Sequence, residues 1–241
     1  MKAAIAIAEA GLVPDLIIRQ GIKMLLRSRL KNQANSDLAD LVRQMSEGPL
    51  AVQTDSANDQ HYEVPAGFFK LMLGQRLKYS CSLYEQESLP LDTAELAMLN
   101  LTADRAGLAN GMDILELGCG WGSLTLYMAQ RYPDSRIVAV SNSNSQREFI
   151  EARAREQGLT NIEVITTDIN EFETTLTFDR VVSIEMFEHL RNYCRLFELT
   201  ASWLKADGRL FFHIFCHRDS PYFFSNESDS DWMARHFFTG G

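Results

Sequence analysis

The stretch 112-MDILELGCGWGSLTLYMAQRYP-133 contains the pattern that decides the fold. An apolar segment leads into three glycines, Gly118, Gly120 and Gly122, and a helical pattern of apolar residues begins directly after them. Glycines in such a turn allow backbone amides to approach a ligand at the N-terminus of the helix. We therefore expect a crevice for a nucleoside compound at the carboxyl end of this strand. The alternative is a tight strand-to-helix turn that binds nothing.

Strands and helices alternate on both sides of the glycine turn. Apolar runs typical of buried strands occupy 112–118, 136–141, 162–168, 178–185 and 209–217, and helical patterns occupy 92–108, 123–132, 145–158 and 193–204. Helices of this length between strands favour parallel pairing with helices on both faces. The sequence thus predicts an α/β protein with a Rossmann-like, doubly wound and mostly parallel sheet.

A different pattern precedes this region. Residues 14–31 and 36–48 have helical periodicity, and a polar stretch then leads to a new helical pattern at 61–73. We place a domain boundary in the polar stretch, with residues 1–60 as an N-terminal helical extension and 61–241 as the main domain. The first helix is basic and could lie on an anionic membrane. We favour docking of its apolar side on the main domain or on a sister subunit in a homodimer.

Composition excludes several classes of function. The 241 residues are 46% hydrophobic with a net charge of −9, and nucleic-acid-binding motifs are absent, so we expect no nucleic-acid partner. No apolar stretch is long enough for a secretory signal or a membrane span. The four cysteines follow no CxxC spacing, which favours reduced thiols and a cytoplasmic location.

We expect no metal site. The region 209–217 contains His213, Cys216 and His217, which could resemble a set of metal ligands. Alternate positions on a strand point to opposite faces, and the sequence contains no second pair of ligands with metal-binding spacing. We interpret these residues as strand or pocket-wall positions.

The ends of the first three strands predict which nucleoside is bound. A dinucleotide site carries GxGxxG and an acid about 20 residues later, whereas here the spacing is shorter and the second strand ends in Ser-Asn-Ser at 141–143. Glu116 stands two residues before the first glycine and suits a ligand with cationic groups, such as the sulfonium and ammonium of S-adenosylmethionine. Asp168 ends the third strand, where a carboxylate can accept a hydrogen bond from the exocyclic amine of a purine. Its alternative role is to cap the following turn.

The stretch 181-VVSIEMFEHL-190 supplies the candidate chemistry. Glu185, Glu188 and His189 follow a buried strand, so they are expected at the same sheet edge as the glycine turn. A protonated amine must lose its proton before it attacks a methyl group, and a carboxylate or an imidazole can receive that proton. Alternatively, Glu188 and His189 pair with each other or cap the next helix.

With these residues in view, the sequence resembles the cyclopropane-fatty-acid synthase superfamily of class I methyltransferases, most closely its coclaurine N-methyltransferase-like branch. The matching stretches are LVPDLIIR (12–19), HYEVP (61–65), LKYSCSLY (77–84), 114–133, SIEMFEHLRNY (183–193) and DWMARHFFTGG (231–241). The resemblance implies that S-adenosyl-L-methionine is the cofactor. It assigns the methionine part to Tyr79, Ser80 and Gly118, the ribose to Asn142 and Gln146, and the adenine to Asp168 and Ile169.

The resemblance also implies the reaction. It favours methyl transfer to the nitrogen of a small-molecule amine, with Glu188 and His189 as the base and Glu185 near the cofactor or the cationic amine. The alternative is methyl transfer to an unsaturated lipid, because in the lipid-modifying relatives the MFEH positions are thought to hold bicarbonate, with a cysteine matching Cys81 nearby. Those relatives commonly have glycine at the position of Glu185. Chains of the family continue past the FFTGG motif, so we expect the C-terminal strands to be missing, and a cofactor-binding protein without activity is a third alternative.

Overall fold

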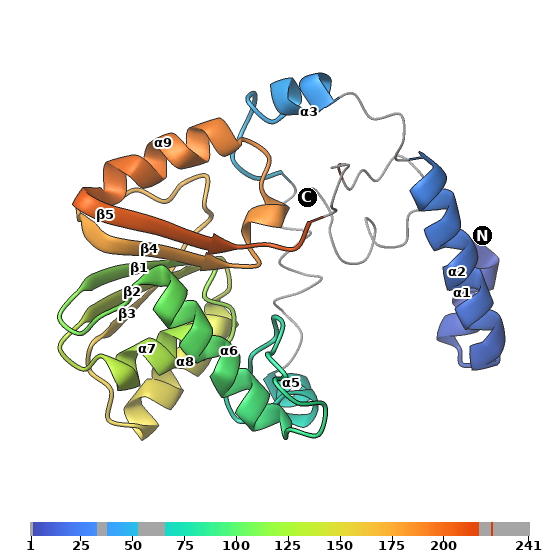
Figure 1. Ribbon diagram of the computed structural model, residues 1–241, viewed down its shortest axis with the longest axis horizontal. Coiled ribbons are helices and arrows are strands. Elements are labelled where there is room, and N and C mark those ends of the chain that lie inside the picture. Colours follow the sequence, from blue (N-terminus) through green and yellow to red (C-terminus); the bar gives the residue numbers. More distant parts are fainter. Residues whose placement is uncertain (1, 33–37, 53–65, 217–222, 224–241) are drawn as a thin grey trace.

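The computed structural model describes residues 2–32, 38–52, 66–216 and 223. Figure 1 shows a central sheet covered by helices on both faces, with α1 (Lys2–Glu9) and α2 (Asp15–Asn32) lying apart from the sheet. The helix α1 was not predicted from the sequence, whereas α2 corresponds to the predicted helix 14–31. None of the helices within these described ranges is long and apolar enough to cross a membrane.

The sheet has the predicted parallel architecture. Its strands are β1 (Asp113–Leu117), β2 (Arg136–Ser141), β3 (Ile162–Thr166), β4 (Phe178–Ile184) and β5 (Leu204–His213). They lie in the order β3-β2-β1-β4-β5, and all four pairings are parallel. The order reverses on either side of β1, and in doubly wound sheets this switch point opens a crevice at the carboxyl ends of the strands.

Helices cover the two faces unequally. The helices α6 (Leu91–Ala106), α7 (Ser123–Arg131) and α8 (Asn144–Glu156) lie on one face, and α9 (Tyr193–Trp203) lies on the other (Figure 1). Alternate residues of β1 serve the two faces. Ile114 packs with the apolar residues of α6 and α7, whereas Leu115 and Leu117 pack in a second cluster with Trp203.

The short helices α3 (Leu38–Gln44) and α5 (Ala66–Met72) lie within the predicted helices 36–48 and 61–73. Backbone and side-chain hydrogen bonds attach the segment after α3 to the main core. Arg191 N–H donates to Leu50 O at 2.7 Å, and Asn170 exchanges two 3.1 Å hydrogen bonds with the backbone of Ala51. The predicted domain boundary at residue 60 lies outside the described residues and stays a prediction.

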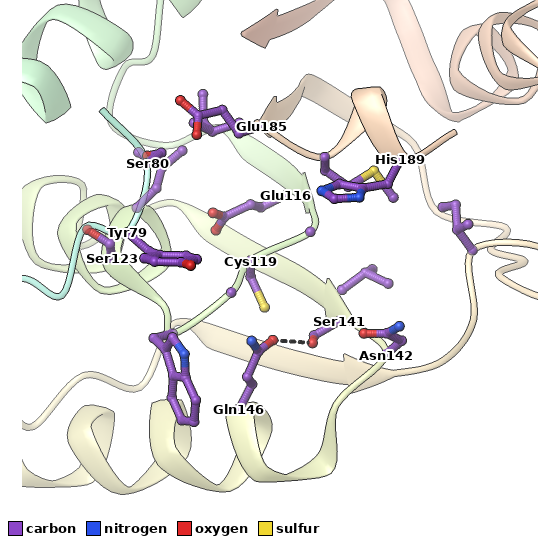
Figure 2. A pocket seen from close by; sticks show the side chains of 18 of the residues that line it. Tyr79, Ser80, Glu116, Cys119, Ser123, Ser141, Asn142, Gln146, Glu185 and His189 are labelled. Atoms are coloured by element: carbon purple, nitrogen blue, oxygen red, sulfur yellow. Dashed lines mark hydrogen bonds between the residues drawn. The ribbon is translucent and has the colours of Figure 1, made fainter. Parts of the chain in front are cut away.

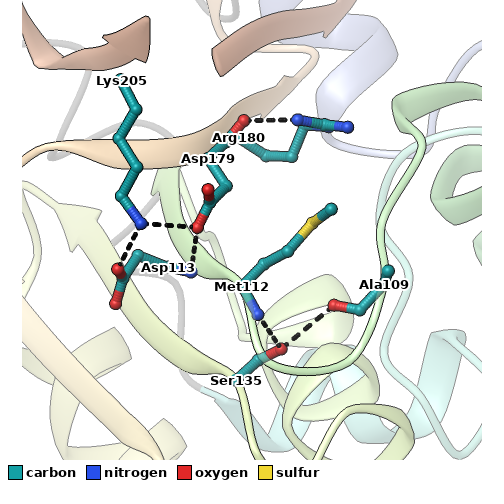
Figure 3. Close-up of polar contacts among 7 residues, drawn as sticks. All are labelled: Ala109, Met112, Asp113, Ser135, Asp179, Arg180 and Lys205. Carbon is teal, nitrogen blue, oxygen red and sulfur yellow. Dashed lines mark hydrogen bonds and ion pairs between the residues drawn. The ribbon is translucent and has the colours of Figure 1, made fainter. Parts of the chain in front are cut away.

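The last strand differs from its predicted range of 209–217. It begins at Leu204, where the backbone turns from helical to extended, and it ends at His213. Lys205 explains the earlier start, because its ammonium joins the amino ends of the neighbouring strands through Asp113 at 2.7 Å and Asp179 at 2.8 Å (Figure 3). Leu204 pairs with Phe178 and Arg209 with Arg180, so the register with β4 shifts across 205–208 and this part of β5 carries a bulge.

Candidate functional site

A cavity of about 450 Å³ opens at the carboxyl ends of the strands, within the size range of small-molecule sites. Nearly all the predicted site residues line it: Tyr79, Ser80, Glu116, Gly118, Gly120, Asn142, Gln146, Asp168, Ile169, Glu185, Glu188 and His189. Figure 2 shows Ser80 and Glu185 toward one end of this space and Asn142 and Gln146 toward the other. The structure thus brings together residues from segments more than 100 positions apart.

The glycine turn forms the floor of the cavity. Gly118 has φ +77°, and a β-carbon on it would lie 2.6 Å from Met186 Cγ, so only glycine allows this close approach. Gly120 has φ +52° and open space where a side chain would project. Gly122 does not line the cavity, because it caps α7, and its missing side chain allows Ile150 to pack closely.

Glu116 is a buried acid beside this floor. Its carboxylate is 3% exposed and accepts a 2.6 Å hydrogen bond from Thr125 Oγ1. Burial raises the pKa of Glu116 to about 8, although the hydrogen bond from Thr125 opposes this shift. A ligand ammonium at this point would favour the ionised carboxylate.

The end of β2 presents amide and hydroxyl groups to the cavity. Ser141 Oγ donates to Gln146 Oε1 at 2.6 Å, which holds the Gln146 side chain at the cavity wall (Figure 2). Ser143 caps the N-terminus of α8 by accepting from Gln146 N–H. Asn142 lies between them and lines the cavity. Neutral polar groups of this kind can hydrogen-bond ribose hydroxyls.

Asp168 combines both roles considered for it. Its Oδ1 accepts the N–H of Asn170 at 2.7 Å, which is the turn-capping interaction, and its side chain also lines the cavity. Ile169 is buried next to it. A carboxylate offers a second oxygen as an acceptor for a ligand amine.

An aromatic cluster lies beside Tyr79 at the cavity wall. Phe69 lies edge-on to Tyr79 with the ring centroids 5.2 Å apart, and it also contacts Trp121 at 5.2 Å. Trp121 is 5% exposed and also lines the cavity. Such apolar walls exclude water from a bound ligand.

Glu185 occupies an unusual backbone conformation where β4 ends. Its φ is +53°, which is uncommon for a residue other than glycine and is often found at functional sites. Its N–H donates to His213 O at 2.7 Å, and its carboxylate accepts from Cys81 N–H at 3.3 Å. These contacts hold the Glu185 carboxylate between two other segments at the edge of the cavity.

Glu188 and His189 belong to a short 3₁₀ helix, η3 (Phe187–His189). Glu188 Oε1 accepts from Phe215 N–H at 3.4 Å, and its buried Oε2 has no hydrogen-bond partner among the residues described. Burial raises the pKa of Glu188 to about 7, with a smaller contribution from the charge of Glu185. A carboxylate with this pKa can exchange a proton near neutral pH.

The sequence did not reveal one grouping at this edge. The ligand atoms of Cys81, Glu185 and His213 all lie within 4.8 Å of one another. A thiol, a carboxylate and an imidazole are donor types that suit zinc. Burial and then the charge of Glu185 raise the pKa of the Cys81 thiol, which disfavours the thiolate that would bind a metal.

Several wall residues were missed by sequence reasoning. They are Ala51, Val52, Lys78, Trp121, Met186 and Phe215. Ala51 and Val52 come from a segment assigned to the extension, and Phe215 follows the last strand. Lys78, Trp121 and Met186 lie within stretches that carry the family resemblance, but no role in the site was assigned to them. The glycine at 118 could have indicated that a bulky side chain approaches it.

The residues present fit S-adenosylmethionine. The cavity places an acid at its floor, neutral hydrogen-bonding groups at the end of β2, and an acid at the end of β3. The fold and this crevice define a class I S-adenosylmethionine-dependent methyltransferase. The chain belongs to the family described as mycolic acid cyclopropane synthetase, whose sequence model matches residues 51–241.

Curated relatives include both N-methyltransferases and cyclopropane-fatty-acyl-phospholipid synthases. The chain is 39% identical over 240 residues to (S)-coclaurine N-methyltransferase of Thalictrum flavum subsp. glaucum, covering 97% of this chain and 66% of the relative. It is 28% identical over 223 residues to the cyclopropane-fatty-acyl-phospholipid synthase of Escherichia coli (strain K12), covering 90% of this chain and 55% of that protein. The chain spans about two thirds of the length of the N-methyltransferases it matches.

Solved structures that match include members of both groups. The crystal structure of coclaurine N-methyltransferase bound to N-methylheliamine and SAH matches with a TM-score of 0.88 and 37% identity, covering 96% of this chain and 69% of that one. A mycolic acid cyclopropane synthase complexed with SAH and CTAB matches with a TM-score of 0.61 and 29% identity, covering 68% and 57%. The predicted fold and family are confirmed.

Proposed function

We propose that the protein transfers a methyl group from S-adenosylmethionine to the nitrogen of a small-molecule amine. The observation that carries this proposal is the set of three titratable side chains, Glu185, Glu188 and His189, beside the glycine floor of one cavity. Similarity to coclaurine N-methyltransferases supports the amine as acceptor. Because this chain spans only about two thirds of the length of those relatives, their activity does not by itself establish the activity of this chain.

When bound, S-adenosylmethionine supplies a methyl group that is already activated by its sulfonium. The protein has to orient the amine and exclude water. In this proposal Asn142 and Gln146 hold the ribose, Asp168 and Ile169 hold the adenine, and Tyr79 and Ser80 cover the methionine part. Glu185 attracts the cationic amine with its fixed carboxylate.

Proton removal then makes the amine nucleophilic. A protonated amine has no lone pair, and Glu188 is our candidate to receive its proton, together with His189. The buried Glu188 Oε2, without a hydrogen-bond partner in the described part of the chain, offers a place for that proton. The pKa of about 7 means that the carboxylate is partly ionised at neutral pH and thus able to accept it.

The direct test uses isotopically labelled cofactor. The protein is incubated with it in a cell extract and with a panel of secondary and tertiary amines, and methylated products are detected by intact-mass analysis. We expect label on an amine, and we expect the Glu188→Gln, His189→Ala double variant to lose it while still binding S-adenosylhomocysteine. Equal turnover in the wild type and the double variant would remove the base assignment.

A lipid acceptor is the second candidate, favoured by the family model and by the similarity to cyclopropane-fatty-acyl-phospholipid synthase. Glu185 argues against it, because an additional carboxylate favours a cation over an alkene. Liposomes of unsaturated phospholipid in the same assay separate the two candidates. A cyclopropane lipid without labelled amine would defeat the amine proposal.

Two properties of the whole protein belong to the same proposal. We place it in the cytoplasm because its four cysteines, Cys81, Cys119, Cys194 and Cys216, are free thiols. We also propose a homodimer through α2, which exposes a row of large apolar side chains between its basic residues. Sedimentation of the wild type and of a Leu16→Glu, Leu30→Glu variant tests this, and an unchanged monomer in both would contradict it.

A further inference from the structure

A buried lysine lies in the cavity wall and has no part in the proposed chemistry. Lys78 is 4% exposed and lines the cavity, next to Tyr79 and Ser80 in sequence. Lysine is almost never this buried unless it is paired. The ammonium group therefore requires a partner with negative charge or several acceptors.

The backbone before Lys78 is strained. Leu77 has φ +50°, a left-handed conformation that costs a leucine about 1–3 kcal/mol. It is held there because its side chain is buried with Phe69 and Trp121 in the aromatic cluster. The strained turn brings the following residue, Lys78, into the cavity wall. Strain of this kind, maintained by packing, is characteristic of functional sites.

The protein itself provides little compensation for the Lys78 charge. Within residues 66–216 its Nζ donates a hydrogen bond to Ser80 Oγ. The acids whose charges act on Lys78 are already engaged by backbone amides, since Glu95 accepts from Gly74 and Arg76, and Glu185 accepts from Cys81. Burial lowers the pKa of Lys78, and the charges of Cys81, Glu185 and Glu95 only partly oppose this.

The same cavity also holds a buried acidic group, Glu116. Glu116 is 3% exposed, and its ionised form is disfavoured by burial as the Lys78 ammonium is. An amino acid carries an ammonium and a carboxylate on one carbon. A ligand with an amino-acid group can therefore compensate both residues at once, whereas a plain nucleoside compensates neither.

We propose that Lys78, held by Ser80, binds the carboxylate of the amino-acid part of the cofactor, with Glu116 facing the ammonium. This makes Lys78 a specificity residue for ligands that carry an intact amino acid. The inference rests on the proposed function only in that it requires the S-adenosylmethionine crevice, and it requires no particular methyl acceptor.

The test compares two ligands by calorimetry. One is S-adenosylhomocysteine, and the other is its decarboxylated analogue, which keeps the ammonium and lacks the carboxylate. We expect Lys78→Met to weaken S-adenosylhomocysteine about 10- to 100-fold, as for loss of a charged hydrogen bond, and to change the analogue less than about threefold. Lys70→Met is the matched control, because Lys70 lies over the Phe149 ring and does not line the cavity.

The two ligands respond differently only if Lys78 contacts the carboxylate. Equal loss for both ligands, or no loss for either, overturns it, and a loss confined to the carboxylate-bearing ligand supports it. Lys78→Gln keeps a polar side chain and gives the same comparison if Lys78→Met fails to fold. A wild type that binds neither ligand overturns both this inference and the proposed function, whereas binding without amine turnover counts against the proposed function alone.

Discussion

Among the residues that the structure describes, charged side chains are paired at one end of the parallel sheet, and buried acids are left without an ion-pair partner at the other. At the amino ends of the strands, Lys205 lies between Asp113 and Asp179, and Asp179 also accepts the N–H of Asp113 at 2.8 Å (Figure 3). The Lys205 ammonium holds the pKa of Asp179 below its usual value. At the carboxyl ends, burial raises the pKa of Glu116 to about 8 and that of Glu188 to about 7.

This difference distinguishes charged residues that stabilise the fold from acidic residues that are available to a ligand. The ion pairs of Lys205 at the amino ends of the strands compensate the charges without any ligand. A buried acid with a raised pKa is unfavourable until a cation or a proton compensates it, and such groups cluster at functional sites. The carboxyl end of the sheet is therefore the end that gains most from binding.

The largest effect is expected for Glu188→Gln. The change keeps the shape of the side chain and removes the group that receives the proton, so we expect amine turnover to fall about 100- to 10,000-fold. Calorimetric affinity for S-adenosylhomocysteine should change little. Turnover measured across pH gives a second check. In the wild type it should rise through the pKa of about 7, where Glu188 ionises, and this step should vanish in the variant.

Gly118→Ala should have the next largest effect. The new methyl group would meet Met186 Cγ at 2.6 Å, and alanine tolerates φ +77° poorly. We expect a loss of about 1–3 kcal/mol in the free energy of unfolding and at least about 10-fold weaker cofactor binding. Gly120→Ala is the matched control, because its φ of +52° adds backbone strain as well while the new methyl group would meet nothing within 4 Å. A larger loss in Gly120→Ala would contradict the close-approach argument.

Proton release on binding is a smaller effect that tests Glu116. At pH 7 its carboxyl group is mostly protonated, because its pKa is about 8. A ligand ammonium lowers that pKa, so a fraction of a proton should leave when S-adenosylhomocysteine binds. Calorimetry in two buffers of different ionisation enthalpy measures this fraction. Glu116→Gln should abolish it, and identical release in wild type and variant would assign the proton to another group.

The smallest effect belongs to the other end of the sheet. Lys205 is about one third exposed, so Lys205→Met should lower the free energy of unfolding by no more than about 1 kcal/mol. Neither turnover nor cofactor affinity should respond. Chemical denaturation measures the free energy of unfolding. A large loss of turnover in this variant would show that the two ends of the sheet are coupled.

Much of this architecture could be predicted from the sequence, because its signals are local. The alternation of strands and helices and the glycines at 118, 120 and 122 define the sheet and its crevice. Parallel strands end at one edge, so Glu116, Asp168 and Glu185 had to converge once the strands were identified.

The remainder depends on contacts between distant segments. Lys78 enters the wall because Leu77 is held by Phe69 and Trp121, and no pattern around 78 reveals this. Ala51 belongs to the wall through Asn170, 119 residues away. The start of the last strand was also wrong, since Lys205 extends it by pairing with acids on two other strands. The raised pKa values of Glu116 and Glu188 follow from burial, which a linear sequence does not specify.

The hydrogen bonds between Ala51 and Asn170 have a consequence for biosynthesis. Contacts of such long sequence separation form late, because a long loop has to close before they contribute. A ribosome-bound chain that ends before Asn170 lacks the hydrogen-bond partners of the segment 48–52 at Asn170, Arg191 and Asn192. We expect such a nascent chain to bind the nucleoside weakly, and full binding to require synthesis through Asn192, which also holds this segment.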